Sequence, residues 1–310
     1  MKICFMGTID FSCRILEEIS KDHEIVLVVC QPDTYVGRKQ VLTYCEVKKL
    51  ALEKGFNIFQ PAKIKDDYQA ILDAKPDLIV TAAYGQFIPD SILKFPPYKA
   101  INVHGSLLPK HRGGAPIQRS IMNGDKETGI SIIYMEKKMD AGDILAQKKI
   151  PILDDDNNTS LFSKLANLGA SMINGVISDL ENNKIKPIKQ NEDEVSFSLN
   201  ISHDEQFIDW RMDATTINNQ IRGLSDEPCA LTSFDGNIIK IFKASVAENN
   251  EDLEPGTIIL GKKELLVKCG KNAIKILDIQ LSSKNRMDIK SFLNGQKLLT
   301  SGCKFSSNIL

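Results

Sequence analysis

The first half of the chain alternates short apolar runs with amphipathic stretches, and this alternation restricts its fold more than any other feature. Parallel strands need long crossover connections, usually helices, so the alternation predicts an α/β domain with a mostly parallel sheet. The predicted strands are residues 2–6, 25–30, 77–82, 100–104, 130–135 and 144–150. Apolar residues at helical spacing predict helices at 11–19, 45–54 and 67–74, and a long helix capped by Thr159 that runs to Leu180.

The second half of the chain has a different pattern. Residues 181–200 are rich in Asn, Lys, Glu and Asp and lack periodicity, which is typical of an interdomain linker. Beyond residue 202, short alternating segments separated by glycines predict a small antiparallel β-barrel, with strands at 238–242, 256–260, 264–269 and 273–280. We therefore expect a first domain over residues 1–183, a linker over 184–204 and a second domain over 205–310.

The charges are balanced overall but not along the chain. The 39 Lys and Arg residues against 40 Asp and Glu give a net charge of -1, which excludes a uniformly basic nucleic-acid binder. Residues 259–304 nevertheless contain ten basic and three acidic residues, a net charge of +7. A solvated lysine-rich surface and a phosphate-binding face explain such a run about equally well. The candidate phosphate contacts are Lys262, Lys263, Lys268 and Lys271.

The cysteines and the apolar segments indicate where such a chain works. Its seven cysteines are odd in number and scattered, and they form no Cys-x-x-Cys pair, so we expect neither a metal site nor a disulfide framework. No stretch approaches the roughly 18 apolar residues of a membrane span, and the apolar run at the amino terminus is too short for a signal peptide. These features predict a cytoplasmic protein with no membrane partner.

The histidine with the strongest functional signal is His104. It ends a predicted strand and precedes a loop rich in Gly and Pro, where open parallel sheets bind ligands. Asn102 lies two residues earlier, so strand alternation places both side chains on one face. An amide and an imidazole that point to the same place can stabilise an oxyanion and accept or donate a proton, as acyl transfer to an amine requires. For an isolated Asn-x-His, simple hydrogen bonding at the strand end is about twice as probable.

A histidine base usually needs a carboxylate that orients it. Asp140 lies in a glycine-containing turn between two predicted strands and is the preferred partner; Asp143, from the same turn, is the competitor. The chain contains no Gly-x-Gly-x-x-Gly, Walker A, Gly-x-Ser-x-Gly or His-Glu-x-x-His motif. Attack of an external amine on a bound acyl donor therefore remains the favoured chemistry.

Several stretches of the chain resemble the folate-dependent formyltransferase family. The resemblance rests on NVHGSLLPKHRGGAPIQ at 102–118, GDKETGISI at 124–132 and MDAGDIL at 139–145. It continues through FMGTIDFS at 5–12, QPDTYVGR at 31–38, AAYGQFIP at 82–89 and FIDWRMDATTINNQIRGL at 207–224. The likeness thus covers nearly the whole chain.

The resemblance implies both an activity and a site. The implied reaction transfers a formyl group from 10-formyltetrahydrofolate, with no metal, to the α-amino group of methionyl initiator tRNA. The implied architecture is a Rossmann-like domain followed by an oligonucleotide-binding-type barrel, in a protein expected to be a monomer. The implied catalytic residues are Asn102, His104 and Asp140. The implied folate contacts are Ser106, Leu107, Leu108 and Pro109, with Ala83, Tyr84, Gly85, Gln86, Phe87 and Ile88 walling the pocket. Arg38 matches a substrate-binding arginine of the family.

Two segments depart from the family pattern. The loop that continues from Arg38 through Glu46 carries fewer cations than is typical, which shifts the electrostatic weight to the segment of charge +7. A Trp-Pro-Gly-Ala motif of the family is replaced by Glu227-Pro228-Cys229-Ala230.

Three other functions fit parts of the same pattern. A related formyltransferase that acts on an amino sugar nucleotide would share the catalytic residues and a similar second domain. A formyl-folate hydrolase would share the catalytic residues but would need no amine acceptor. A noncatalytic RNA-binding protein would need no Asn102, His104 and Asp140 set at all.

Overall fold

A computed structural model describes residues 1–37, 39–282, 284–296 and 298–307. The chain divides into two compact units. The first consists of Met1–Pro116, Glu127–Pro151 and Phe162–Leu199, and the second of Ile117–Lys126, Ile152–Leu161 and Asn200–Leu310. Two short segments from the first half of the chain thus belong to the second unit. Most of the segment predicted as a linker, up to Leu199, packs with the first unit.

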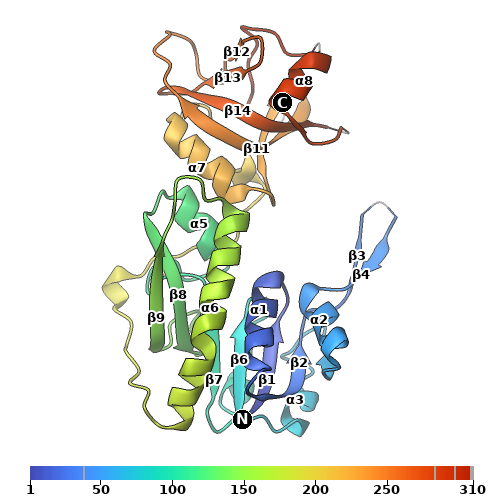
Figure 1. The fold of residues 1–310 in the computed structure, drawn as a ribbon, viewed down its shortest axis with the longest axis vertical. Coiled ribbons are helices and arrows are strands. Elements are labelled where there is room, and N and C mark those ends of the chain that lie inside the picture. Colours follow the sequence, from blue (N-terminus) through green and yellow to red (C-terminus); the bar gives the residue numbers. More distant parts are fainter. Residues whose placement is uncertain (38, 283, 297, 308–310) are drawn as a thin grey trace. The chain divides into compact units, whose positions relative to one another are not determined.

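The first unit is built on a seven-stranded sheet (Figure 1). Its order is β5-β2-β1-β6-β7-β8-β9, in which the pairs β7–β8 and β8–β9 are antiparallel and the other pairs are parallel. The strands are β1 (Lys2–Gly7), β2 (Glu24–Val29), β5 (Ile58–Phe59), β6 (Leu78–Ala82), β7 (Ala100–His104), β8 (Glu127–Tyr134) and β9 (Ile144–Pro151). The predicted Rossmann-like, mostly parallel sheet is confirmed, and only the two-residue strand β5 was not expected.

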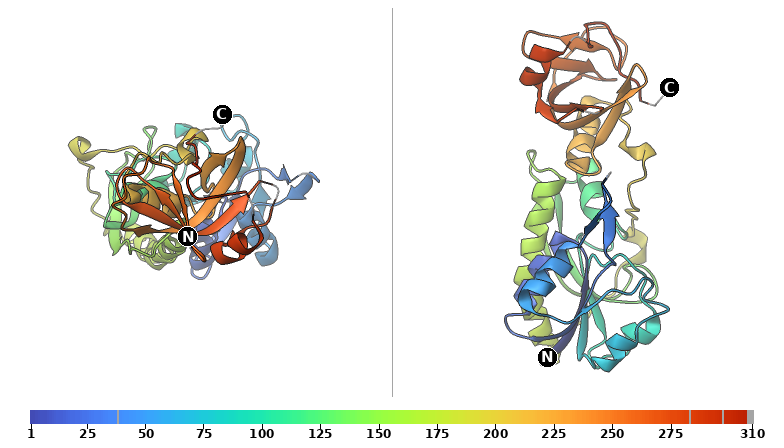
Figure 2. Two further views of the ribbon diagram at one scale, coloured as in Figure 1. Left: turned by 90° about the horizontal axis from the view of Figure 1, so that it is seen from above. Right: turned by 90° about the vertical axis from the view of Figure 1, so that its right-hand side faces the viewer.

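Helices cover both faces of this sheet (Figure 2). On one face, Gly169 of the long helix α6 lies against Val103 of β7, Ile130 of β8 and Ile15 of helix α1. On the other, α3 and α4 contribute Ile71, Ile92 and Leu93 to a buried apolar cluster. The helices of the first half are α1 (Asp10–Ile19), α2 (Glu46–Lys54), α3 (Gln69–Asp73), α4 (Asp90–Leu93) and α5 (Pro116–Met122), followed by α6 (Asn158–Glu181).

The start of α6 differs from the prediction. Asn157, not Thr159, caps the helix: its Oδ1 accepts a hydrogen bond from the Ser160 amide at 2.9 Å. The Ser160 hydroxyl in turn accepts from the Asn157 amide at 3.0 Å. This reciprocal pair satisfies two amides that the helix itself leaves unbonded, so it outcompetes a threonine two residues later.

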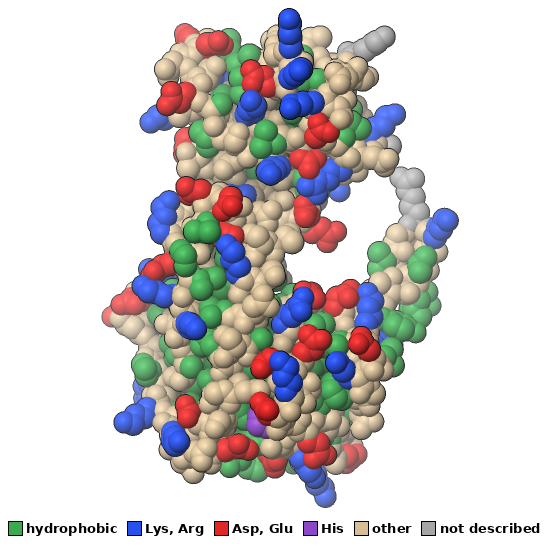
Figure 3. Space-filling view, viewed as in Figure 1, with side chains coloured by type: hydrophobic (Ala, Val, Ile, Leu, Met, Phe, Trp, Pro, Cys, Tyr) green, Lys and Arg blue, Asp and Glu red, His purple; other side chains and the backbone are tan. Residues whose placement is uncertain are grey.

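A small hairpin projects from the first unit between β2 and α2 (Figure 1). Its strands are β3 (Thr34–Val36) and β4 (Val41–Thr43), where the sequence had predicted only a loop. Tyr35, Val36, Val41 and Leu42 are all about half exposed or more, and Figure 3 shows hydrophobic side chains on this projection. Arg38, the predicted substrate-binding arginine, lies outside the described residues.

The second unit is an antiparallel sheet in the order β10-β11-β14-β13-β12, with β15 paired to β14. Its strands are β10 (Ala230–Phe234), β11 (Asn237–Ala247), β12 (Ile258–Leu260), β13 (Leu265–Lys268), β14 (Ala273–Leu281) and β15 (Met287–Asp288). Two helices, α7 (Ala214–Leu224) and α8 (Ile289–Gly295), supply apolar residues to its core. Short 3-10 turns at Glu192–Glu194 and Asp204–Gln206 lie on either side of the sequence boundary between the units. The predicted second β domain is confirmed, although the strands β10 and β15 were not expected.

The segment 303–306 joins the two edges of this sheet. Ser306 exchanges backbone hydrogen bonds of 2.8 and 3.0 Å with Ser233 of β10. At the other edge, Ile258 of β12 donates to the carbonyl of Cys303 at 2.8 Å. The two end strands, β10 and β12, are therefore both paired with this segment, which closes the sheet into a barrel-like form.

No helix in the described part of the chain is long and apolar enough to cross a bilayer.

Phe305 anchors the closing segment and provides a test of it. Its ring is 4% exposed and stacks on Trp210 with centroids 5.9 Å apart. We expect Phe305→Ala to destabilise the protein by about 3–5 kcal/mol, because it removes this ring and leaves a cavity. Thermal and urea unfolding would measure the change in stability. The matched control is Phe95→Ala, at a position 42% exposed, and an equal effect of both variants would contradict the role of the segment.

Candidate active site

His104 lies at the carboxyl end of β7 with its ring almost fully buried. Its Nε2 is 3.0 Å from the backbone carbonyl of His111. Because a carbonyl oxygen only accepts, Nε2 carries the hydrogen of this bond. The lone pair of the neutral imidazole is therefore on Nδ1, which is the position from which the ring can accept a proton.

Asp140 faces that nitrogen. Its Oδ1 is 3.7 Å from His104 Nδ1, longer than a hydrogen bond but close enough for strong attraction to an imidazolium. The other carboxylate oxygen, Oδ2, accepts a hydrogen bond from the Gly113 amide at 2.8 Å. Asp143, the competing candidate, lies immediately before β9, where its backbone carbonyl accepts from the amide of Tyr134 and so extends the pairing with β8.

The turn His111–Gly113 positions both side chains, and it is itself held by residues 196–198. The Arg112 amide donates to the Ser196 carbonyl at 2.9 Å, and the Ser198 amide donates to the Arg112 carbonyl at 2.7 Å. The Ser196 hydroxyl accepts from the His111 amide at 2.9 Å. The Ser198 hydroxyl bonds the His111 ring at 2.7 Å.

Gly113 is required where this turn meets residues 196–198. Its φ is +127°, and a Cβ at this position would lie 2.6 Å from the Ser198 carbonyl oxygen. A larger residue would push apart the two segments and draw the Gly113 amide away from Asp140.

Arg112 connects the turn to the loop that carries Asp140. Its side chain is fully buried, and its Nε and Nη2 bond Gln190 Oε1 at 3.1 and 2.8 Å. The Gln190 amide nitrogen donates to the carbonyls of Asp140 and Gly142 at 2.7 and 2.8 Å. Glu192 balances the charge of Arg112 across an N–O distance of 2.8 Å.

Asn102 projects from β7 on the same face as His104, as strand alternation predicts. The Thr81 hydroxyl of β6 donates to Asn102 Oδ1 at 2.9 Å. This contact orients the amide and leaves its nitrogen, a donor, without a protein partner within the described residues. The Asn102 nitrogen is therefore available to a ligand oxygen.

Polar side chains of the antiparallel strands β8 and β9 fix the backbone of the loop 105–110. Ser131 of β8 is the cross-strand neighbour of His104. Its hydroxyl accepts from the Leu108 amide at 3.0 Å and donates to the Ser106 carbonyl at 2.6 Å. Gln147 of β9 donates to the Leu108 carbonyl at 2.9 Å and to the Ser131 hydroxyl at 2.8 Å. Buried backbone groups of the loop are thus satisfied before any ligand arrives.

Family models match both parts of the chain. One described as "Formyl transferase" matches residues 1–177, and one described as "Formyl transferase, C-terminal domain" matches residues 200–297. The chain belongs to the formyl transferase family. The resemblance to the folate-dependent formyltransferases, and with it the prediction of an enzyme, is thereby confirmed.

Curated relatives cover almost the whole length of this formyl transferase. A methionyl-tRNA formyltransferase of Listeria monocytogenes is 44% identical over 297 residues, 95% of either chain. One from Bacillus mycoides is 45% identical over 302 residues, 96% of either chain. Relatives with this name and similar coverage thus come from different bacteria.

Solved structures share the fold at much lower identity. An N-formyltransferase from Helicobacter canadensis, in complex with folinic acid and dTDP-3-aminofucose, has a TM-score of 0.68 at 21% identity and covers 89% of this chain and 98% of its own. Methionyl-tRNA formyltransferase from Clostridium thermocellum has a TM-score of 0.57 at 17% identity, with 91% and 98% covered. These likenesses support the fold alone.

The segment from Ala83 to Ile88 divides between core and surface. Tyr84 and Ile88 are buried in the same apolar cluster as Ile71 and Ile92 of α3 and α4. Burial raises the pKa of Tyr84. Phe87, by contrast, is 65% exposed, and Ala83 and Gly85 are exposed with positive φ. Only the exposed members and the backbone of this segment can contact a ligand directly.

The predicted phosphate contacts are not equivalent. Lys262, Lys263 and Lys271 are exposed, and Figure 3 shows basic side chains over the second unit. Lys268 is 8% exposed and its ammonium group donates to the Asn249 carbonyl at 3.0 Å. Lys268 is thus occupied within the fold, whereas the other three are accessible to a ligand.

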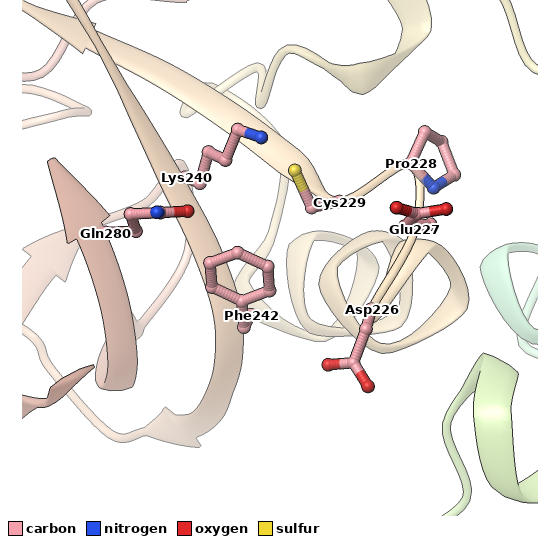
Figure 4. A pocket seen from close by; sticks show the side chains of 7 residues that line it. All are labelled: Asp226, Glu227, Pro228, Cys229, Lys240, Phe242 and Gln280. Atoms are coloured by element: carbon pink, nitrogen blue, oxygen red, sulfur yellow. The ribbon is translucent and has the colours of Figure 1, made fainter. Parts of the chain in front are cut away.

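The second unit also contains a pocket of about 730 Å³. It is lined by Asp226, Glu227, Pro228, Cys229, Lys240, Phe242 and Gln280 (Figure 4). The positions that depart from the family motif, Glu227 and Cys229, are among them. In Figure 4 the Lys240 and Cys229 side chains point toward one another. Four of the residues that line it, Asp226, Glu227, Cys229 and Lys240, carry titratable side chains.

Sequence reasoning missed the residues that support the site. Gln190, Ser196 and Ser198 lie in the segment predicted as a linker, where no periodicity marked them. Ser131 and Gln147 lie within predicted strands, where nothing in the sequence marked them as site residues. A polar residue at a buried strand position, such as Ser131, can nevertheless indicate a specific hydrogen-bonding role. No group of three or more His, Cys, Asp or Glu residues among those described is arranged to hold a metal ion.

The Arg112–Glu192 pair yields a pH-dependent prediction. Hydrogen bonds from Arg112 and Lys138 lower the pKa of Glu192 from 4.5 to about 2. The carboxylate therefore contributes stability above pH 4.5 that is lost as the pH falls toward 2. We expect Glu192→Gln to lower the melting temperature at pH 7, with a difference from the wild type that shrinks below about pH 4.5. Circular dichroism melts across this range would measure it.

Glu194→Gln is the control for this prediction. Glu194 lies in the same short turn, and its side chain accepts only from the Asn191 side chain among the described residues. A Glu192→Gln difference that is as large near pH 3 as near pH 7 would contradict the proposed charge pairing.

Proposed function

We propose that this formyl transferase moves the formyl group of 10-formyltetrahydrofolate to the α-amino group of methionyl initiator tRNA. The observation that carries the proposal is that Asn102 and His104 project from one face of β7 and that Asp140 lies 3.7 Å from the His104 ring. The 41–45% identity of relatives named methionyl-tRNA formyltransferase supports the choice of acceptor.

The geometry assigns a separate task to each of these side chains. Attack of the amine on the formyl carbon places negative charge on the formyl oxygen, and the free nitrogen of Asn102 is the donor that stabilises it. The attacking amine must lose a proton, and His104 accepts it at Nδ1. Asp140 then stabilises the imidazolium across 3.7 Å, while the Gly113 amide keeps the carboxylate in place. When the tetrahedral intermediate collapses, the bond between the formyl carbon and the folate nitrogen breaks, and the imidazolium returns the proton to that nitrogen, which leaves as tetrahydrofolate.

The donor binds in this proposal against loop 106–109 and the exposed part of segment 83–88. Leu107 and Phe87 offer apolar surface for a pterin ring, and the loop backbone is already held by Ser131 and Gln147. A loop that is rigid before binding loses little conformational entropy when the ligand arrives. Each step of this chemistry is assigned to a protein side chain, so the proposal calls for no metal.

Related formyltransferases differ in the amine to which they transfer the formyl group. An amino sugar nucleotide remains the second candidate, because the Helicobacter canadensis neighbour was solved with one. The separate β domain with exposed Lys262, Lys263 and Lys271 favours a polyanionic acceptor larger than a nucleotide sugar.

A side-by-side assay tests both the acceptor and the mechanism. With 10-formyltetrahydrofolate as donor, we expect formylation of methionyl initiator tRNA and none of an amino sugar nucleotide. We expect His104→Ala and Asp140→Ala each to lower turnover by about 10²–10⁴-fold, because each removes the acid-base function. Affinity for tRNA should change little, because neither side chain supplies phosphate contacts.

His203→Ala is the control, since this exposed histidine lies in the second unit. Near-normal turnover of His104→Ala would overturn the mechanism. Preferential formylation of the sugar nucleotide would overturn the acceptor, and formate release without any amine acceptor would indicate a hydrolase.

The lysines of the second unit give a separate prediction for RNA binding. We expect the double variant Lys262→Ala/Lys263→Ala to weaken tRNA binding at low salt. The slope of log Kd against log salt should fall by up to about 0.9 for each phosphate that the variant no longer neutralises. Lys65→Ala, an exposed lysine of the first unit, is the control. An unchanged slope would mean that these lysines do not contact phosphates.

A further inference from the structure

Two glutamine side chains fix the segment 83–88 at the sheet edge where His104 lies. The segment runs as irregular backbone from the end of β6 to the start of α4, with positive φ at Ala83 and Gly85. Gln31 follows β2, which is parallel to β1 and through it to β6 and β7. Since parallel strands have their carboxyl ends at one edge of the sheet, Gln31 lies at the same edge as the segment.

The side chain of Gln86, within this segment, is engaged by the protein. Its Oε1 accepts from the Ile64 amide at 2.8 Å, and its Nε2 donates to Gln31 Oε1 and to the Pro61 carbonyl, both at 3.2 Å. Only this orientation of the amide satisfies all three contacts, because an N–H group faces an oxygen in each of them. Gln86 therefore uses its polar atoms within the fold, although the family resemblance implied a folate contact for it.

Gln31 connects Gln86 to the backbone of the same segment. Because Gln31 Oε1 accepts from Gln86, its Nε2 faces the Tyr84 carbonyl, to which it donates at 3.0 Å. The Thr8 hydroxyl, which follows β1, donates to the same carbonyl at 2.9 Å. Both lone pairs of the Tyr84 carbonyl are thus used, and the backbone between Ala83 and Gly85 is fixed from two sides.

Gln60 holds Gln31 through its main chain. The Gln60 Nε2 donates to the Gln31 carbonyl at 2.7 Å and to Asp33 Oδ1 at 3.0 Å. The other oxygen of Asp33 pairs with Lys48 of α2 at 2.5 Å. Gln31 is therefore fixed at its backbone as well as at both ends of its side-chain amide.

We propose that Gln86 and Gln31 are positioning residues for the formyl donor, an inference that rests on the proposed binding of the donor against segment 83–88. They hold the exposed backbone of Ala83 and Gly85 and the exposed ring of Phe87 in place for the pterin, while their own polar atoms bond the protein. Because this wall is ordered before the donor arrives, donor binding costs less conformational entropy.

Donor binding and steady-state kinetics of the full-length protein test the proposal. Gln86→Met keeps the length of the side chain and removes its polar atoms. We expect it to raise the Kd for folinic acid, the folate bound by the Helicobacter canadensis neighbour, by about 5–20-fold, because the wall loses three hydrogen bonds. The KM for 10-formyltetrahydrofolate should rise by a similar factor. The kcat at saturating donor and the KM for methionyl initiator tRNA should change by less than about twofold, because the catalytic contacts of His104 are left intact.

Gln69→Met is the matched control. Gln69 is an exposed glutamine of α3 in the same unit, and its Nε2 donates to Asp73 at 2.8 Å. We expect no change in the Kd for folinic acid. Circular dichroism melts of each variant would show that it is folded.

Gln31→Met is a second, independent variant and should also raise the Kd for folinic acid. Because Gln31 and Gln86 share a hydrogen bond, we expect the double variant to raise this Kd by less than the product of the two single effects.

Three results would count against the proposal. An unchanged Kd for folinic acid in both Gln86→Met and Gln31→Met would overturn it. A lower kcat with an unchanged KM for the donor would assign the two glutamines to the catalytic step instead. If the wild-type protein itself does not bind folinic acid, the proposed donor site fails and this inference fails with it, so the wild type distinguishes the two failures.

Discussion

The candidate active site depends on a single turn, His111–Gly113, that supplies both polar groups orienting the acid-base pair. A carbonyl from this turn accepts the hydrogen of His104 Nε2, and an amide from it binds Asp140 Oδ2. The positions of the imidazole and the carboxylate are therefore coupled through a short stretch of backbone. Neither side chain can move without breaking a contact to the same turn, which is how a site keeps its geometry before substrate binds.

The position of this turn depends in turn on the residues that bond it. Residues 196–198 bond it along its length, and buried Arg112 links it through Gln190 to the carbonyls of Asp140 and Gly142. A buried guanidinium is costly unless it is paired, and Glu192 and Gln190 provide that pairing. The acidic 3-10 turn at the protein surface is thus connected to the loop that carries Asp140 through the buried side chain of Arg112.

The sequence predicted those parts of the site that depend on local rules. Strand alternation placed Asn102 and His104 on one face, and the position of the strand end placed them at the ligand-binding edge of the sheet. The supports could not be predicted in this way, because Ser196 and Ser198 pair with residues far away along the chain and lie in a segment without periodicity. The β3–β4 hairpin was missed because its strands are very short and expose their apolar side chains. The sequence predicted Lys268 as a phosphate contact, yet its side chain is buried and its ammonium group donates to both the carbonyl and the side-chain oxygen of Asn249.

The distance along the chain between the turn and its supports has a consequence for folding. The hydrogen bond between the His111 ring and the Ser198 hydroxyl spans 87 residues, whereas each parallel strand pair of the sheet forms over shorter separations. Residues 196–198 follow the last strand of the sheet, so this contact forms only when the chain beyond β9 and α6 has folded back onto the first unit. A partly folded chain can therefore possess a complete-looking sheet and still lack an organised His104 and Asp140. Under the proposed mechanism, the activity of this molecule reports on the completion of folding and not merely on the presence of its secondary structure.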